Sequence, residues 1–122
     1  VLTNKLSKDF SRGDVVVFKN PNNEKEFYIK RIIGLPGERI QVQEGHVMIN
    51  GEGIRERYLP AGPETNGNTN LTLGKDEYFV MGDNREKSFD SRSFGPIKKS
   101  DIKGKVFYEI PDRFKSLFYS RS

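Results

Sequence analysis

Residues 82–92 gather side chains that can take part in chemistry. Their sequence, Gly-Asp-Asn-Arg-Glu-Lys-Ser-Phe-Asp-Ser-Arg, contains two arginines, two aspartates and two serines. It follows directly after an apolar run at residues 77–81 that has the composition of a β-strand. Loops held by a rigid scaffold commonly carry catalytic or binding residues. The sequence therefore predicts a functional site in this segment.

A lysine inside an apolar strand is the second candidate. Residues 26–33 alternate so that Tyr28, Lys30 and Ile32 share one face of a strand, whereas Arg31 lies on the other face. A lysine acts as a general base only as the free amine, and apolar neighbours favour that form by lowering its pKa from about 10.4. The alternative is an ordinary strand lysine whose ammonium extends into solvent.

These two segments, together with a third, resemble type I signal peptidases. The third is Arg-Gly-Asp-Val-Val-Val-Phe at residues 12–18, and the lysine segment reads Tyr-Ile-Lys-Arg-Ile-Ile-Gly-Leu-Pro-Gly at residues 28–37. All three occur in the family's order, and the resemblance extends over almost the whole chain. Shorter matches lie at residues 49–51, 56–59, 93–95 and 104–106.

The resemblance assigns roles to individual residues. It implies that Lys30 is the general base, that Ser88 orients the lysine amine and that Arg31 is structural. Asp90 and Arg92 correspond to an ion pair beside the site. Without the resemblance, Ser88 would be typical of a turn residue. Asp90 and Arg92 would then be typical of a solvated surface ion pair, which contributes less than about 1 kcal/mol to stability. The residues that match the turn at the start of the polar segment are Gly82, Asp83, Asn84 and Arg85.

The family's nucleophile is a serine in a Ser-Met-x-Pro segment, which lies before the Arg-Gly-Asp strand and after a membrane-spanning helix. The 122 residues contain no such segment. The family's oxyanion-hole donors come from the same segment, and losing even one such donor lowers the rate by about 10²- to 10³-fold. We therefore expect this chain to be a fragment that has no peptidase activity by itself.

The resemblance also implies a function for the whole protein. The implied function is that of a membrane-anchored serine endopeptidase, which removes signal peptides from exported preproteins on the extracytoplasmic side of the cell membrane. The expected partners are signal peptides of secretory preproteins and an anionic membrane surface; no cofactor, metal or nucleic acid is expected. Exposed apolar side chains around Phe89 and Phe94 would suit contact with the bilayer.

The composition favours an all-β fold, because Val, Ile, Phe and Tyr prevail among the apolar residues and 12 Gly and 6 Pro punctuate the chain. The resemblance implies antiparallel sheets curled into a partly open barrel. The length suits one domain over residues 1–122. Residues 39–43 and 46–50 predict a hairpin closed by Glu44 and Gly45. Further expectations are a surface loop at about 58–73, a helical turn at 100–103 capped by Ser100, and a last strand at 105–110.

Composition also limits the alternatives. The chain has no cysteine, and His46 is its only histidine, which excludes disulfides, a Ser-His-Asp triad and a histidine-rich metal site. A net charge of +4 without a long basic block does not indicate nucleic-acid binding. No stretch approaches the roughly 18 apolar residues of a spanning helix. Three alternatives stay open: an inactive homologue that binds peptides or proteins, a repressor-type self-cleaving Ser/Lys domain, and a basic β-barrel that binds nucleic acid.

Overall fold

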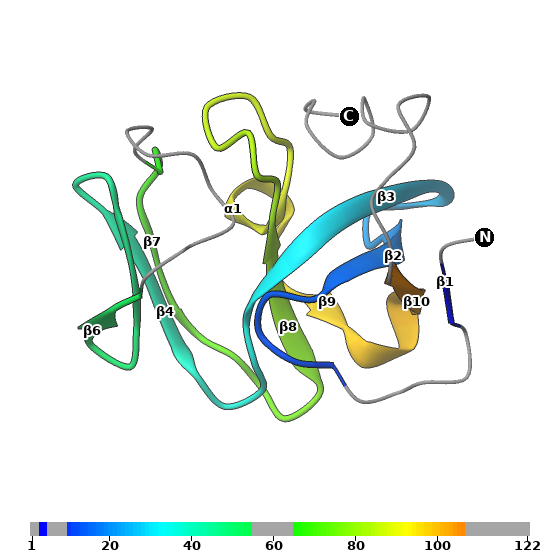
Figure 1. Ribbon diagram of the computed structural model, residues 1–122, viewed down its shortest axis with the longest axis horizontal. Helices are drawn as coiled ribbons and strands as arrows, with labels where there is room; N and C mark the ends of the chain where they lie inside the picture. Colours follow the sequence, from blue (N-terminus) through cyan, green and yellow to red (C-terminus); the bar gives the residue numbers. More distant parts are fainter. Residues whose placement is uncertain (1–2, 5–9, 55–64, 107–122) are drawn as a thin grey trace.

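Two antiparallel β-sheets make up the part of the chain that the computed structural model describes, residues 3–4, 10–54 and 65–106 (Figure 1). In spatial order, the larger sheet consists of β1 (Thr3–Asn4), β10 (Ile102–Val106), β2 (Val15–Asn20), β3 (Asn23–Gly34), β8 (Glu77–Met81) and β9 (Ile97–Lys98). The smaller sheet consists of β6 (Glu52–Gly53), β5 (His46–Ile49), β4 (Arg39–Gln43) and β7 (Thr69–Thr72). Two short helical segments are α1 (Ser91–Phe94) and the 3₁₀ helix η1 (Lys99–Asp101).

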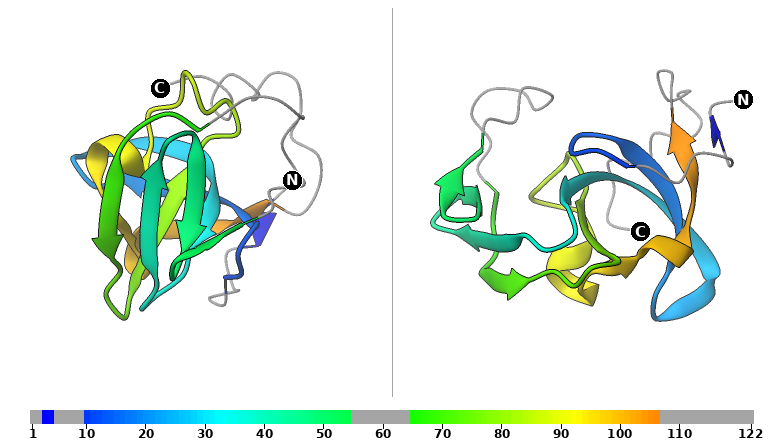
Figure 2. Two further views of the ribbon diagram at one scale, coloured as in Figure 1. Left: turned by 90° about the vertical axis from the view of Figure 1, so that its left-hand side faces the viewer. Right: turned by 90° about the horizontal axis from the view of Figure 1, so that it is seen from below.

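The prediction of an all-β fold with antiparallel sheets is confirmed. Every pair of neighbouring strands in both sheets is antiparallel. Figure 2 shows the two sheets from the side and from below, where they lie at an angle to each other and do not close into one barrel. The chain passes from the larger sheet to the smaller one at the turn between β3 and β4.

A β-bulge in β3 lies just before this passage. Ile32 pairs with Val80 on β8, but the next pair joins Gly34 to Phe79, so Ile33 is an extra residue on β3. Ile32 and Ile33 are both completely buried but enter different apolar clusters, because successive side chains of a strand point to opposite faces. The first cluster comprises Phe10, Val16, Phe18, Tyr28, Ile32, Tyr78, Val80, Ile97 and Ile102. The second comprises Ile33, Ile40, Val42, Val47, Ile49, Leu73, Phe79 and Met81.

Strand β8 separates the two clusters. Tyr78 and Val80 on one of its faces belong to the first cluster, while Phe79 and Met81 on the other face belong to the second. Both faces of β8 are therefore buried, which explains why its sequence is a continuous apolar run instead of an alternating one. The polar segment at residues 82–92 begins where this strand ends.

Replacing Gly34 with alanine is expected to destabilise the protein by about 1–3 kcal/mol. A Cβ atom at this position would lie 2.9 Å from Leu73 Cδ1 and closer still to Ile40 Cδ1. Both side chains are buried in the second cluster, so neither can move without disturbing its packing. Urea denaturation of Gly34→Ala, Ile40→Val and the double variant tests this. Since Ile40→Val removes the Cδ1 atom, strictly additive losses in the double variant would contradict the steric explanation.

The hairpin predicted at residues 39–50 is confirmed, with β4 and β5 in the expected register. Its turn residues Glu44 and Gly45 have φ angles of 52° and 81°. Positive φ at both positions matches the right-handed twist of the flanking strands, and glycine at the second position adopts it without strain. Asn50 and Gly51, at φ of 52° and 84°, form the next turn and lead into β6.

Three expectations about local structure need correction. A surface loop was expected at about 58–73, but this is wrong for residues 69–72, which form β7 and pair with β4. Main-chain pairing there outweighs the weak strand propensity of Asn70. Residues 55–64 lie outside the described residues. The helical turn begins one residue early, as η1 after Lys98, so Ser100 is not its cap. The last strand begins at Ile102, and the described part of the chain ends at Val106.

An ion pair fixes the turn between the two sheets. Arg12 Nη1 and Nη2 each lie 2.7 Å from an oxygen of the Glu38 carboxylate. Arg12 Nη1 also donates to the Ile33 carbonyl at 2.9 Å, and Glu38 Oε1 accepts the Leu35 N–H at 2.7 Å. The pair therefore links the residues before β2 to the end of β3 and to the turn that follows it.

This ion pair predicts a loss of stability below about pH 4.5. Burial by itself would raise the pKa of Glu38, but hydrogen bonds from Arg12 and the Leu35 amide, and the charge of Arg12, lower it below its ordinary 4.5. A carboxyl whose pKa is lowered by folding stabilises the native state above the unfolded-state pKa, and this contribution is lost as the pH falls through the folded-state pKa. Acid unfolding of wild type and Glu38→Gln checks it. Identical pH dependence in the two proteins would contradict the prediction.

Candidate active site

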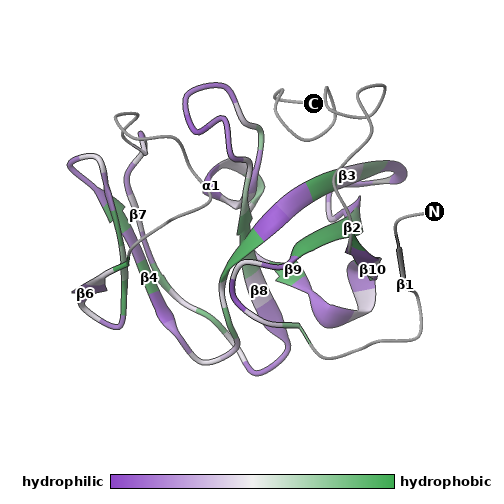
Figure 3. Ribbon diagram, in the orientation of Figure 1, coloured by the Kyte–Doolittle hydropathy of each residue, from purple (hydrophilic) through white to green (hydrophobic). Residues whose placement is uncertain are grey.

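Lys30 lies on the inner face of β3 and is completely buried. Its side-chain neighbours along the strand are Tyr28 and Ile32, as the alternation predicted, and it is paired with Val16 on β2. Figure 3 shows a hydrophilic band across the middle of β3 between hydrophobic stretches. A lysine of 0% exposure is not an ordinary strand lysine that extends into solvent.

The structure brings Ser88 to this lysine. Lys30 Nζ donates a hydrogen bond to Ser88 Oγ at 3.2 Å, across 58 residues of sequence. The Nζ atom also lies 5.9 Å from the centre of the Tyr28 ring. Lys30 and Ser88, predicted from separate segments, therefore form one site at the end of β8.

Folding lowers the pKa of Lys30 from 10.5 to about 8. Burial is the largest cause, because removal from water disfavours the ammonium, and the positive charge of Arg92 acts in the same direction. The carboxylates of Asp90 and Asp83 oppose this change. With a pKa near 8, about a tenth of the lysine is free amine at pH 7, compared with well under a thousandth at the ordinary value.

Asp90 and Arg92 form a buried, bidentate ion pair. Arg92 Nε and Nη2 lie 2.9 Å and 2.8 Å from the two oxygens of Asp90, whose carboxylate is completely buried. The same carboxylate accepts the N–H groups of Gly82, at 3.0 Å, and of Arg92, at 3.1 Å, and so caps the start of α1. The interpretation as a solvated surface pair is wrong, because the loop folds back over the end of β8.

Arg31 holds the other side of the loop. Its side chain lies opposite that of Lys30 on β3, as predicted, where Nε and Nη2 donate to the Asp83 carboxylate at 3.0 Å and 2.9 Å. Arg31 Nη1 donates to the Gly13 carbonyl at 2.8 Å. Residues 82–92 are thus attached to both faces of β3, through Ser88 on one face and Asp83 on the other.

The residues predicted to set the turn do lie in it. Arg85 N–H donates to the Asp83 carbonyl at 3.0 Å, and Lys87 N–H donates to the Asn84 carbonyl at 3.1 Å. The Arg85 side chain, only 2% exposed, returns to the Gly82 carbonyl through Nε at 2.8 Å. These hydrogen bonds close the first half of the loop. Because the Arg85 guanidinium donates to a main-chain carbonyl of the loop, it can occupy a buried position there.

Sequence reasoning missed three residues around the site. Ser91 is buried and accepts the Val80 N–H at 2.9 Å, which fastens α1 to β8. Thr65 and Asn66 accept hydrogen bonds from Arg85 and Arg92. No local pattern in the sequence marks Ser91, Thr65 or Asn66, because each binds a residue of a separate segment.

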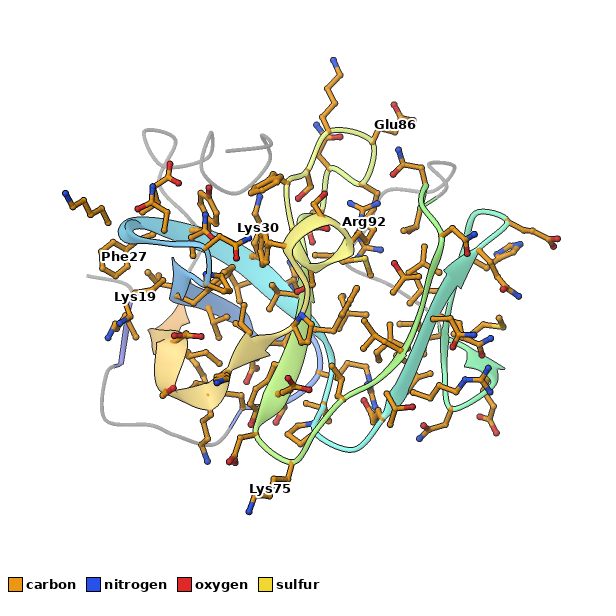
Figure 4. The ribbon with its side chains drawn as sticks, turned by 180° about the vertical axis from the view of Figure 1, so that it is seen from behind. Lys19, Phe27, Lys30, Lys75, Glu86 and Arg92 are labelled. Carbon is orange, nitrogen blue, oxygen red and sulfur yellow. The ribbon has the colours of Figure 1, made fainter. Side chains whose placement is uncertain are left out.

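The aromatic side chains beside Lys30 are not exposed as expected. Phe89 and Phe94 are half-buried and pack against each other, with ring centres 5.3 Å apart, and each contacts Tyr28. Their packing against the first cluster leaves them only partly exposed. Among the described residues, the exposed large apolar side chain is Phe27, which Figure 4 shows with Lys19 at the end of the β2–β3 hairpin, away from Lys30 and Arg92 near α1.

Comparison with known proteins decides the family. The family model described as "Signal peptidase, peptidase S26" matches residues 1–110 of the 122. The chain belongs to the signal peptidase family. This membership argues against the repressor-type self-cleaving domain as an alternative.

Several signal peptidases are similar to the chain. Signal peptidase I P of Bacillus subtilis subsp. natto is 41% identical over 110 residues, which cover 82% of this chain and 59% of that protein. Signal peptidase I V of Bacillus subtilis strain 168 is 39% identical over 122 residues, which cover 87% and 71%. A crystal structure of a signal peptidase I from Enterococcus faecalis V583 matches with a TM-score of 0.71 and 30% identity, covering 81% of this chain and 97% of that one. The chain thus spans about three fifths of the length of the first relative.

Two further observations apply to residues 3–4, 10–54 and 65–106 alone. This part of the chain has no helix long and apolar enough to cross a membrane. It also has no group of three or more histidine, aspartate or glutamate side chains arranged to hold a metal ion.

Proposed function

We propose that this chain is the lysine-bearing part of a Ser/Lys signal peptidase, with Lys30 as the general base and Ser88 as the residue that orients its amine. The observation that carries the proposal is the wholly buried Lys30 with Nζ 3.2 Å from Ser88 Oγ. Burial favours the free amine, and the serine hydroxyl fixes its direction. Asp90, Arg92 and the turn at Gly82, Asp83, Asn84 and Arg85 support this arrangement.

The reaction would use a nucleophilic serine from outside these 122 residues, because the sequence holds no Ser-Met-x-Pro segment. Lys30 Nζ would take the hydroxyl proton as the serine oxygen attacks the scissile carbonyl carbon. The lysine ammonium would then give that proton to the leaving amine as the C–N bond breaks. In the second half, Lys30 would take a proton from the water that attacks the acyl-serine ester and return it to the serine oxygen as the ester C–O bond breaks.

The substrates would be signal peptides of secretory preproteins, because the similar proteins named above are signal peptidases. The whole protein would be anchored in the cell membrane, with this chain on the extracytoplasmic side and near anionic headgroups. The reaction as written needs no cofactor, metal or nucleic acid. One domain would perform it, because strands β3 and β8 contribute to both apolar clusters.

The experiment that tests the proposal compares the purified 122-residue chain with the protein encoded by the complete gene. Both are incubated with a peptide that carries an Ala-x-Ala cleavage site. We expect cleavage by the complete protein and none by the 122-residue chain. Cleavage by the chain alone that disappears in Lys30→Ala would place the nucleophile inside these residues. An inactive complete protein that still binds the peptide would identify a binding module.

Ser88→Ala is expected to lower kcat of the complete protein by about 10²-fold, because a misdirected base loses most of its benefit. KM should change little, since Ser88 is assigned no contact with the substrate. Ser88→Thr, which keeps the hydroxyl, should retain more activity than Ser88→Ala. Steady-state kinetics of the three proteins check this. Equal kcat for wild type and Ser88→Ala would remove Ser88 from the mechanism.

A further inference from the structure

Two arginines of the active-site loop bind two adjacent residues, Thr65 and Asn66, which precede β7 of the smaller sheet. Arg85 Nη1 donates to Thr65 Oγ1 at 2.9 Å. Arg92 Nη1 donates to the Asn66 carbonyl at 2.9 Å and to Asn66 Oδ1 at 2.7 Å. Since Arg85 lies before Ser88 and Arg92 lies after it, both ends of the Ser88 loop are attached to one short segment.

This segment is itself fixed to the smaller sheet. Thr65 is 3% exposed, and its N–H donates to the carbonyl of Gly45, in the turn between β4 and β5, at 3.1 Å. The segment then runs into β7, which pairs with β4. Between Asn66 and β7, Gly67 has a φ of 111°, and a Cβ atom at this position would lie 3.4 Å from Arg92 Cδ. The backbone after Asn66 therefore turns closely around the arginine side chain.

Each guanidinium connects this segment to the loop. The Nε of Arg85 donates to the Gly82 carbonyl, and the Nε and Nη2 of Arg92 donate to Asp90. A guanidinium is planar, so donors on its different edges fix the relative positions of the groups that they bind. The arginines thus transmit the position of Thr65 and Asn66 to the two ends of the Ser88 loop.

We propose that Thr65 and Asn66 are positioning residues of the active site, which hold Ser88 Oγ against Lys30 Nζ through Arg85 and Arg92. The inference rests on the proposed function, because it names what maintains the Lys30 site. It gives the smaller sheet a part in the site although none of its strands contributes Lys30, Ser88 or Asp90. Neither Thr65 nor Asn66 touches the reacting amine, so their effect is indirect.

Loosening this segment should raise the pKa of Lys30. Among the described residues, the charges of Asp90, Arg92 and Asp83 act on the amine. A less firmly held loop admits water to Lys30, which favours the ammonium. The charges of Asp90 and Arg92 act on this pKa in opposite directions and would move together as an ion pair, so the loss of burial, which is the largest cause, decides the direction.

The test is a ¹³C NMR titration of Lys30 in the 122-residue protein. The variants are Thr65→Val, which replaces the hydroxyl with a methyl group, and Asn66→Ala, which removes Oδ1. Thr65→Ser retains the hydroxyl, and Asn68→Ala changes an exposed residue of the same connection, so these two are matched controls. Hydrogen exchange of the Gly82 and Arg92 amides, both donors to Asp90, reports on the loop.

We expect Lys30 to titrate near 8 in wild type and both controls, and at least about half a unit higher in Thr65→Val and Asn66→Ala, a threefold change in acidity. The Gly82 and Arg92 amides should exchange faster in the same two variants. Urea denaturation of wild type and the four variants separates a displaced Ser88 loop from a general loss of stability, which would leave the Lys30 pKa unchanged. Asn66 is exposed, so Asn66→Ala decides the matter if Thr65→Val does not fold.

Two results would overturn the inference, and only the second of them would also contradict the proposed function. A Lys30 pKa that stays near 8 in Thr65→Val and Asn66→Ala, with unchanged amide exchange, would reject the positioning role and leave the proposed function intact. A wild-type Lys30 that titrates near 10.5 would reject the general-base assignment as well, because no perturbed lysine would then exist for the segment to maintain.

Discussion

Replacing Lys30 with methionine is expected to abolish peptidase activity of the protein encoded by the complete gene, with a loss of at least about 10³-fold in kcat. Methionine has a similar length and keeps the apolar contacts with Tyr28 and Ile32, but it cannot accept a proton. In wild type, kcat should rise with pH through about 8, where the Lys30 amine becomes free. The measurement is a pH series of steady-state cleavage of a signal-peptide substrate.

The same variant is expected to be more stable than wild type. Lowering the pKa of Lys30 from 10.5 to about 8 means that the ammonium disfavours the native state, by about 3 kcal/mol at pH 7. Because the unfolded chain binds the proton more tightly, wild-type stability should rise with pH between about 8 and 10.5. Lys30→Met should lack this rise. Urea denaturation at several pH values measures both effects.

Lys103→Met is the matched control, because Lys103 is an exposed lysine on β10. It should leave activity and the pH dependence of stability unchanged. A Lys30→Met protein that is active, or that is less stable than wild type at pH 7, would contradict the picture of a desolvated base.

Asp90→Asn and Arg92→Gln are expected to move the pKa of Lys30 in opposite directions. The Asp90 carboxylate raises this pKa, so its loss should bring the value below about 8. The Arg92 guanidinium lowers it, so its loss should bring the value above about 8. Each variant should also lose about 3–5 kcal/mol of stability, because it leaves a partner charge buried without its counterion.

NMR titration of Lys30 and urea denaturation of the two single variants and the double variant test this. The double variant removes both buried charges, so it should lose less stability than the sum of the single losses. It should also restore a Lys30 pKa between those of the single variants. Shifts of the same sign in the two single variants would show that loop disorder, and not the charges, controls the lysine.

Local patterns in the sequence predicted most of the strands. The alternation at residues 26–33 placed Lys30 and Arg31 on opposite faces, and the Glu44-Gly45 pair predicted the turn between β4 and β5. Both features depend on neighbouring residues alone, since alternation and positive φ are properties of a few adjacent positions. The resemblance of residues 12–18, 28–37 and 82–92 to signal peptidases indicated the family, which the comparisons confirmed.

Other features depended on contacts between distant residues. The expected loop at 58–73 includes β7, whose only strong reason to be a strand is its pairing with β4. Phe89 and Phe94 looked like candidates for exposed apolar surface, but packing against Tyr28 and Phe18 leaves them only half-exposed. The pairing and packing partners decided both outcomes.

The sequence by itself determined the residue types of the site and the strand that carries the lysine. Only the tertiary structure decided that Lys30 is buried, that Ser88 lies against it and that Asp83 binds Arg31, since these contacts join residues 58 and 52 positions apart. It also decided that Thr65 and Asn66 take part. The physical reason is that a pKa depends on solvent exclusion and on nearby charges, and folding supplies both by bringing together segments that have no local relation in the chain.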